Sequence, residues 1–446
     1  MKYTYTSITI VLFTALVSCK PKIEAPEASM GDVDGSRYIA IGTNNTSGFA
    51  NDGLSFYSQD NSYAAIIANQ FNEVSTIEFK QPFVSAGSIG FNIDGKSPLK
   101  LGYKTDCKGV TSISPVRIAG AGDLTQLINQ YAGYGPFNNF GVTGMSALSV
   151  NLAGYGNPAN GAGNFNPYFA RFTSNEATAS VLSDAVARNP TFFTIMLGDD
   201  DILAYAKSGG TSGPIPDANG AAGVGFSGSL EEVITSLTAN GAKGAISNIP
   251  DVKEYPYFTT IPYNGLTVDA ANAVTLNQIF NPIGISFVVG VNAFVMEDPA
   301  APFGVRQMVE GELVLLSTPL DSVKCNGTGS VFPFRDEFVL DLDEVAEINS
   351  KISEYNSVIT NLSQTYGLAY ADTKSLIHRL KTGTVYNGVS MSSAFVTGGA
   401  YSLDGLQLNP NGQALLANTF IEAINFSFNA AIPYANPIKY AGNIFP

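Results

Sequence analysis

Three short polar segments of this chain contain the groups that could carry out chemistry. Residues 43–47 (TNNTS) follow an apolar run, residues 199–201 are three consecutive aspartates after another apolar run, and Asp404 and Gln407 precede a helix-like segment. Hydroxyl groups are potential nucleophiles, adjacent carboxylates can bind Ca²⁺ or Mg²⁺, and amides can hold a ligand by hydrogen bonds. The sequence therefore allows acyl transfer, cation binding or ligand binding at these segments.

The only histidine, His378, restricts which of these reactions are feasible. A histidine-rich metal site is excluded, and any mechanism that uses imidazole as a general base must use this residue. His378 belongs to a predicted helix that begins after Asp372 and lies well before Asp404. A histidine on a helix surface is therefore favoured over a relocated general base.

The composition sets the class of protein. The chain has 446 residues, of which 45% are hydrophobic and 13% are charged, and its formal net charge is −14. This apolar content is enough for a large core and excludes a disordered chain. The acidic balance argues against a nucleic-acid partner, because binding to phosphates needs a basic surface.

The first residues predict where the protein is located. Residues 1–18 have the pattern of a secretory signal peptide, and their apolar stretch is too short to span a bilayer. The stretch ends in Leu-Val-Ser-Cys, which resembles the lipobox of bacterial lipoproteins and implies lipidation of Cys19; a chance cysteine beside an ordinary signal is the alternative. Residues 19–36 are predicted to be a polar tether. We expect a cell-envelope protein that is held to the outer membrane only by its lipid, facing the periplasm or the cell surface.

The elements that position the polar segments alternate between strand and helix. The predicted strands cover residues 37–41, 191–197, 241–249 and 367–372, and the predicted helices cover residues 61–71, 344–366 and 409–425. This order predicts an α/β fold with a parallel central sheet, helices on both faces and ligand sites at the carboxyl ends of the strands. Residues 37–446 are interpreted as one domain with long loop or β insertions.

Two features lie outside this alternating pattern. Residues 284–296 form an apolar stretch in which Phe287, Val288, Val289, Val291, Phe294 and Val295 predict buried strands. Cys107 and Cys325 could form a disulfide in an oxidising envelope or remain as two isolated buried thiols. The sequence leaves both alternatives open.

Four segments, in order along the chain, resemble the sequence blocks of the SGNH (GDSL-type) hydrolases, and in particular the large lipoprotein esterases of Bacteroidetes-type bacteria. The segments are GTNNTSGFA (residues 42–50), NFGVTG (139–144), GDDDIL (198–203) and SLDGLQLNP (402–410). Four blocks at suitable spacing favour the family more strongly than any single block does. The resemblance implies a three-layer α/β/α, flavodoxin-like fold and an ancestral serine ester hydrolase.

The resemblance also implies a role for five positions. Asn44 falls where the family has its nucleophilic serine, Gly144 and Asp200 fall where it has oxyanion donors, and Gln407 falls where it has the histidine base. Asp404 matches the acid that orients this base. Only Gly144 and Asp404 keep the residue type of the family.

The three replacements remove reactivity. The Asn44 amide is a poor nucleophile because its nitrogen lone pair is delocalised, and Gln407 cannot exchange a proton near neutral pH. An ionised Asp200 about 4 Å from a developing oxyanion would cost about 4 kcal/mol at an effective dielectric constant of about 20. A rescue by Ser47 and His378 would need both side chains to enter the same site.

We therefore expect a non-catalytic, cofactor-free protein whose cleft binds a glycan or an acylated ligand through Asn44, Gly144, Asp200 and Gln407. Asn44 is predicted to donate a hydrogen bond to Asp200, and Gln407 to Asp404, in one closed network. The alternatives are an active esterase or lipase with rearranged residues, and a structural lipoprotein that binds a partner protein. For residues 199–201, a turn is favoured over a metal site, because three consecutive side chains cannot all converge on one point.

Overall fold

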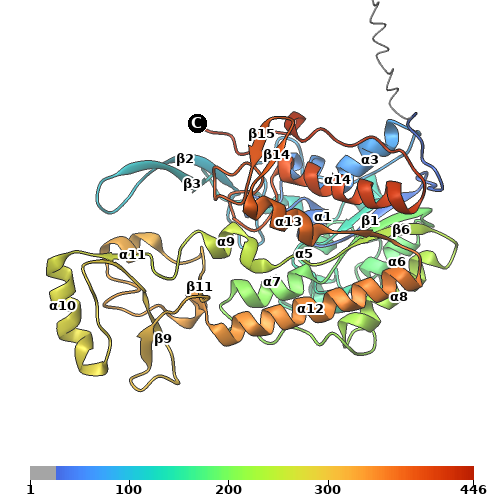
Figure 1. Cartoon of the computed structure of the whole chain (residues 1–446). Helices are drawn as coiled ribbons and strands as arrows, with labels where there is room; N and C mark the ends of the chain where they lie inside the picture. Colours follow the sequence, from blue (N-terminus) through green and yellow to red (C-terminus); the bar gives the residue numbers. More distant parts are fainter. Residues whose placement is uncertain (1–26) are drawn as a thin grey trace, which may run out of the picture.

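A five-stranded parallel sheet lies at the centre of the computed structural model, which describes residues 27–446 (Figure 1). Its strands are β1 (Tyr38–Gly42), β4 (Asn139–Gly141), β5 (Phe192–Met196), β6 (Lys243–Ser247) and β13 (Ala369–Ala371). They lie in the order β13-β6-β5-β1-β4, and each neighbouring pair is parallel. Counted along the chain this is the order 2-1-3-4-5 of doubly wound sheets. The predicted α/β fold with a parallel central sheet is confirmed.

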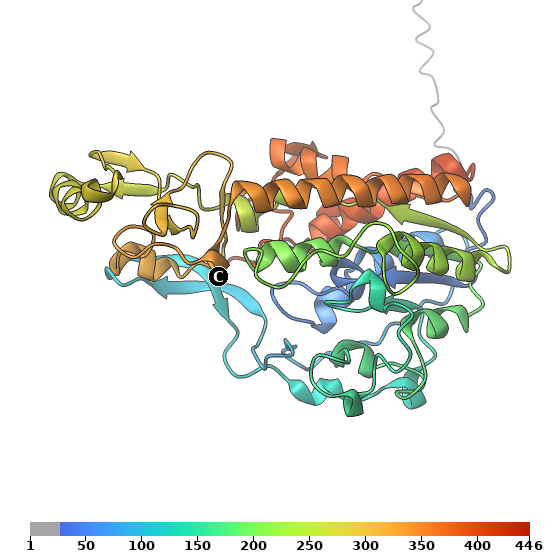
Figure 2. The same cartoon turned by 90° about the horizontal axis from the view of Figure 1, so that it is seen from below.

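Helices cover both faces of the sheet (Figures 1 and 2). One group consists of α3 (Tyr63–Asn72), α13 (Thr373–Thr382) and α14 (Pro410–Ser427), and the other of α6 (Val181–Val186), α7 (Asp199–Lys207), α8 (Phe226–Thr238) and α12 (Leu342–Thr365). The sequence predicted α3, α12 and α14 to within two residues at each end. Each helix begins directly after a capping side chain, because Ser62, Asp341 and Asn409 each accept a hydrogen bond from a first-turn N–H.

The register of the sheet brings three strand ends to one level. Gly42 pairs with Met196 of β5 on one side and with Gly141 of β4 on the other. The short helix α1 (Asn44–Ser47) turns back directly over these ends. A Cβ at Gly42 would lie 2.2 Å from Thr46 Oγ1, and one at Gly141 would lie 2.2 Å from the Ser47 nitrogen, so larger residues would push α1 away from the sheet.

Two insertions extend beyond this layered body (Figure 1). The first is the hairpin of β2 (Leu99–Thr105) and β3 (Thr111–Arg117). The second, residues 261–340, is called the lobe here, and it contains two small apolar clusters apart from the main core. The lobe contains α10 (Ala270–Phe280), α11 (Leu320–Cys325), β7 (Leu266–Val268), β8 (Gly290–Asn292), β9 (Val295–Glu297), β10 (Val305–Gln307), β11 (Leu313–Val314) and β12 (Val339–Leu340).

The remaining elements are short. They are α2 (Phe56–Asp60), α4 (Tyr131–Tyr134), α5 (Pro167–Ala170), α9 (Pro256–Thr259), β14 (Thr384–Tyr386) and β15 (Val389–Met391). None of the helices within residues 27–446 is both long and apolar enough to cross a membrane.

The prediction of buried strands in residues 284–296 is confirmed at Val295, which is buried and begins β9, and Phe287 and Phe294 are also buried. It is wrong for the three valines of residues 288–291. Val288, Val289 and Val291 are 63%, 66% and 63% exposed. Val291 belongs to β8, which pairs only with β7 in a two-stranded sheet. β-branched residues favour a strand but do not by themselves bury it; burial needs a second layer, and the small lobe does not supply one here.

Cys107 and Cys325 form a disulfide, with 6.5 Å between their Cα atoms. Both residues are exposed, so the alternative of two isolated buried thiols is wrong. The bond joins the β2–β3 hairpin to α11 of the lobe, two segments that are separated by 218 residues in the chain.

The predicted signal peptide (residues 1–18), Cys19 and most of the tether lie outside the described residues. Residues 27–36, the described part of the tether, contact the main body. Ser29 forms an antiparallel bridge with Ala431, and Val33 is buried.

Candidate functional site

The carboxyl ends of β1 and β5 and the loop after β4 open onto a cleft of about 1030 Å³. Asn44, Gly144, Asp200, Asp404 and Gln407 all line this cleft. The order of the strands reverses at β1, whose neighbours are β4 and β5, and open α/β sheets bind ligands in the crevice at such a reversal. The structure thus brings together all five positions that the sequence singled out.

Asn44 connects the first three of the sequence blocks. Its Nδ2 donates to Asp200 Oδ1 at 2.8 Å, and its Oδ1 accepts from the Gly144 N–H at 3.2 Å. Both Asn44 and Asp200 are buried. The predicted hydrogen bond between Asn44 and Asp200 is therefore present, and the carboxamide group lies between the two groups that the family resemblance assigns to the oxyanion.

Asp404 and Gln407 interact differently from the prediction. Asp404 Oδ1 accepts from the backbone N–H groups of Leu406 and Gln407, each at 2.8 Å, and its Oδ2 accepts from the Asp52 N–H at 3.0 Å. The Gln407 side chain makes no hydrogen bond to the described part of the chain, so the predicted donation from its amide to Asp404 is wrong. The tight turn at Gly405, with φ of +74°, brings the backbone N–H groups to the carboxylate first. The polar groups therefore form two separate clusters instead of one closed network.

Burial dominates the electrostatics of the three aspartates at the start of α7. It raises the pKa of Asp199 and that of Asp201 from 3.8 to about 6, although hydrogen bonds from Thr43 and Ser146 oppose the shift. Burial also raises the pKa of Asp200 well above 3.8, and the neighbouring charge of Asp199 adds to this. The repulsion of about 4 kcal/mol that was expected for an ionised Asp200 therefore applies only to its charged form, which burial disfavours.

The three aspartates diverge. Asp199 Oδ1 accepts from Thr43 Oγ1 at 3.0 Å, Asp201 Oδ2 accepts from the Ala147 N–H at 2.9 Å, and Asp200 contacts Asn44. Within residues 27–446, no group of three acidic, histidine or cysteine side chains has a geometry that could hold a metal ion. The turn predicted for residues 199–201 is the first turn of α7, in which each carboxyl group has a different partner.

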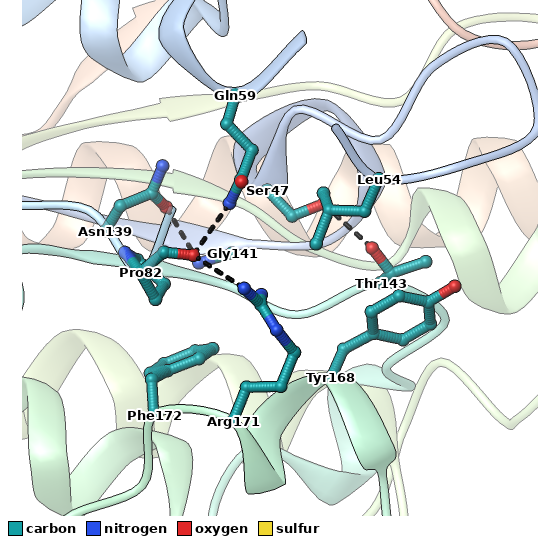
Figure 3. Close-up of a pocket in the computed structure, with 10 residues that line it drawn as sticks. All are labelled: Ser47, Leu54, Gln59, Pro82, Asn139, Gly141, Thr143, Tyr168, Arg171 and Phe172. Atoms are coloured by element: carbon teal, nitrogen blue, oxygen red, sulfur yellow. Dashed lines mark hydrogen bonds between the residues drawn. The ribbon is translucent and has the colours of Figure 1, made fainter. Parts of the chain in front are cut away.

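Ser47 does not face the cleft. Its Oγ contacts Thr143 Oγ1 at 2.9 Å and the carbonyl oxygen of Asn44 at 3.0 Å. It lines a separate cavity of about 10 Å³, shown in Figure 3, which has room for about one water molecule and not for an ester. Arg171 closes this cavity by donating to the carbonyl oxygen of Pro82 at 3.1 Å.

His378 lies on the surface of α13, with its side chain 64% exposed, and its Nδ1 is 2.7 Å from Glu254 Oε1. It does not line the cleft. Ser47 and His378 therefore do not form a rearranged catalytic pair in this structure.

The cleft also contains residues that the sequence analysis missed. Phe49, Asp52 and Lys207 line it, and Asp52 forms an ion pair with Arg117 of the hairpin. One signal was available: Asn51 and Asp52 adopt φ values of +56° and +54°, and an Asn-Asp-Gly sequence is typical of such turns.

The chain matches no protein-family model, no curated protein and no solved structure. The geometry of the cleft is therefore the starting point for assigning a function.

Proposed function

We propose that the protein is a degenerate SGNH-type hydrolase that binds a glycan or an acylated ligand in the cleft and does not cleave it. The observation that supports this most directly is the position of Asn44. It stands at the first residue of α1, directly after the first strand and its Thr43 cap, where an SGNH enzyme has its nucleophile. Its amide is bound to Gly144 and Asp200, and an amide nitrogen cannot attack an acyl carbon.

The proton-transfer half of an ester hydrolase also lacks support. Gln407 occupies the position of the base, and all three contacts of Asp404 described above are with backbone N–H groups. The cleft keeps hydrogen-bonding groups, but Asn44 and Gln407 cannot act as the nucleophile and the proton-exchanging base at the two positions where the family has them. This is the pattern expected of a binding site derived from an enzyme.

The location and the partners remain proposals. We propose an envelope lipoprotein anchored through Cys19, with a glycan or acylated small molecule as its ligand and with neither a cofactor nor a nucleic-acid partner. A role as a structural lipoprotein would instead show as stable co-purification with an outer-membrane protein.

The test restores the family's residue types at three positions, as N44S/D200N/Q407H. The wild-type protein should not hydrolyse short p-nitrophenyl esters above the buffer rate. The triple variant should gain measurable turnover and react with a phosphonate, because Asp404 and Gly144 are retained.

Two single variants serve as controls for the alternative enzyme. S47A and H378A should leave the wild-type background unchanged. Turnover by the wild-type protein that either variant abolishes would contradict the proposal and favour an esterase with rearranged residues.

A further inference from the structure

The cleft continues past Asn44 into a second cavity. This cavity measures about 700 Å³ and shares with the first the residues Asn44, Phe49, Asp52, Gly144 and Lys207. The two cavities are therefore two arms of one site that meet above the Asn44 amide. Together they exceed the usual volume of a site for a small molecule, about 300–1,000 Å³.

The first arm, called the roofed arm here, has a mixed lining in which a group of aliphatic side chains lies among charged ones such as Lys104, Arg117 and Asp321. Its apolar lining includes Ile113, Leu203, Leu316, Leu320, Leu403 and Leu406. Ile113 is 40% exposed and Leu320 is 50% exposed. These side chains present apolar surface to a cavity, where a ligand with an apolar chain would remove that surface from water.

The roof of this arm is made by the two insertions. Ile113 comes from the β2–β3 hairpin, and Leu316 and Leu320 come from the lobe. The Cys107–Cys325 disulfide and the ion pairs Lys104–Asp321 and Lys324–Asp106 join the two insertions. These cross-links fix the position of the hairpin relative to the lobe, and therefore the position of the aliphatic side chains that both insertions contribute to the arm.

The second arm, called the asparagine arm here, is lined mainly by asparagine and aromatic side chains instead of aliphatic and charged ones. Its lining includes Asn92, Tyr155, Asn160, Asn164, Phe165 and Tyr168. Asn160 and Asn164 are exposed, and each of their amides donates a single hydrogen bond to the described part of the chain, to Gly154 and to Asn160 respectively. Amides with spare hydrogen-bonding groups beside aromatic rings suit a ligand that is rich in hydroxyl groups.

We propose that one amphiphilic molecule occupies both arms, with an unbranched alkyl chain under the roof and a neutral, hydroxyl-rich headgroup in the asparagine arm. This inference rests on the proposed function and deepens it, because it joins the two ligand classes in a single compound. The boundary between headgroup and chain lies above Asn44, where the two arms meet.

The experiment is calorimetry on the full-length protein with hexyl, octyl and decyl β-glucoside below their critical micelle concentrations, and with octanol and glucose as the two halves. Affinity should increase with chain length, by up to about fourfold for each methylene group that is fully buried. Octyl glucoside should bind at least tenfold more tightly than either half.

Matched variants locate the two parts of the ligand. I113D places a charge in the roofed arm and should abolish the dependence on chain length, whereas V110D, on the same hairpin at an exposed residue outside the lining, should not. N164A combined with F165A should reduce the affinity for octyl glucoside towards that for octanol. Circular dichroism checks that all variants fold.

The outcomes separate the two proposals. Equal affinity for octanol and octyl glucoside, or a dependence on chain length that survives I113D, would overturn the two-armed assignment and leave the proposed function standing. If no compound bound and the N44S/D200N/Q407H variant also stayed inactive, both proposals would fail.

Discussion

The floor and the roof of the cleft are built in opposite ways. The floor, formed by Asn44, Gly144 and Asp200, lies at the level ends of three parallel strands and buries polar groups. The roof, formed by the β2–β3 hairpin and the lobe, belongs to two-stranded sheets and exposes aliphatic side chains. Sheet register and buried hydrogen bonds hold the floor, whereas a disulfide and ion pairs hold the roof. We therefore expect the stability of the floor to depend on substitutions that alter its buried polar groups, and the stability of the roof to depend on loss of the disulfide or the ion pairs.

The largest expected change in stability comes from removing the disulfide between the two parts of the roof. The variant C107S/C325S should lose about 2–5 kcal/mol of stability, because the disulfide closes a long loop in the unfolded chain. Scanning calorimetry with and without a reductant measures this loss, and a reductant should affect only the wild-type protein.

The comparison predicts a local effect in addition to this global loss. Hydrogen exchange should accelerate more in the hairpin and in α11 than in β1 and β5, whose amides should lose only the protection that corresponds to the global loss of stability. Equal loss of protection in the floor would show that floor and roof unfold as one unit.

The second largest effect is a change in stability with pH, which arises from buried carboxyl groups next to the floor. Asp199 and Asp201 titrate near 3.8 in the unfolded chain and near 6 in the folded protein. Their contribution to stability is therefore complete below about pH 4, is lost as the pH rises towards 6, and stays lost above that value. Each carboxyl accounts for a change on the order of 3 kcal/mol, since one pKa unit corresponds to about 1.4 kcal/mol.

The variant D201N isolates one of these carboxyls. Its amide oxygen can still accept from the Ala147 N–H, but the group no longer titrates. Denaturant unfolding between pH 4 and pH 8 should show a smaller decline for D201N than for the wild-type protein. Identical declines would contradict the assignment of burial as the dominant cause.

The smallest effect is expected for N44A. This change leaves Asp200 and the Gly144 N–H without their partner and should cost about 1–3 kcal/mol of stability. Denaturant unfolding measures the cost, and C107S/C325S provides the comparison for the roof. If N44A were more stable than the wild-type protein, the hydrogen bonds of Asn44 would not be what stabilises the floor.

Much of the layered body was predictable from the sequence. The predicted strands 191–197, 241–249 and 367–372 contain β5, β6 and β13, and the predicted strand 37–41 covers β1 except for Gly42. The helix predicted for residues 344–366 matches α12 to within two residues at each end. Such features are local, because periodicity and capping depend on residues a few positions apart. The valine run at 288–291 shows the limit, since the same residues suit a buried strand or an open one.

The candidate site was predictable in membership and not in geometry. The sequence placed Asn44, Asp200 and Asp404 in one crevice and predicted the hydrogen bond between Asn44 and Asp200, but it wrongly paired the Gln407 amide with Asp404. That error concerns which groups are nearest after folding, and the backbone N–H groups of the turn at Gly405 are nearer to Asp404 than the Gln407 side chain is.

The sequence by itself determined which atoms are available: an amide in place of a hydroxyl at position 44, a single imidazole, and strands in an order that forms a parallel sheet. Only the tertiary structure decided that Ser47 turns away from the cleft, that the imidazole contacts Glu254, and that Cys107 meets Cys325. The physical reason is distance along the chain. A local sequence pattern depends on residues that are close together along the chain. The contacts that shape the cleft join segments that are far apart along the chain, and no local pattern shows which of these segments come together.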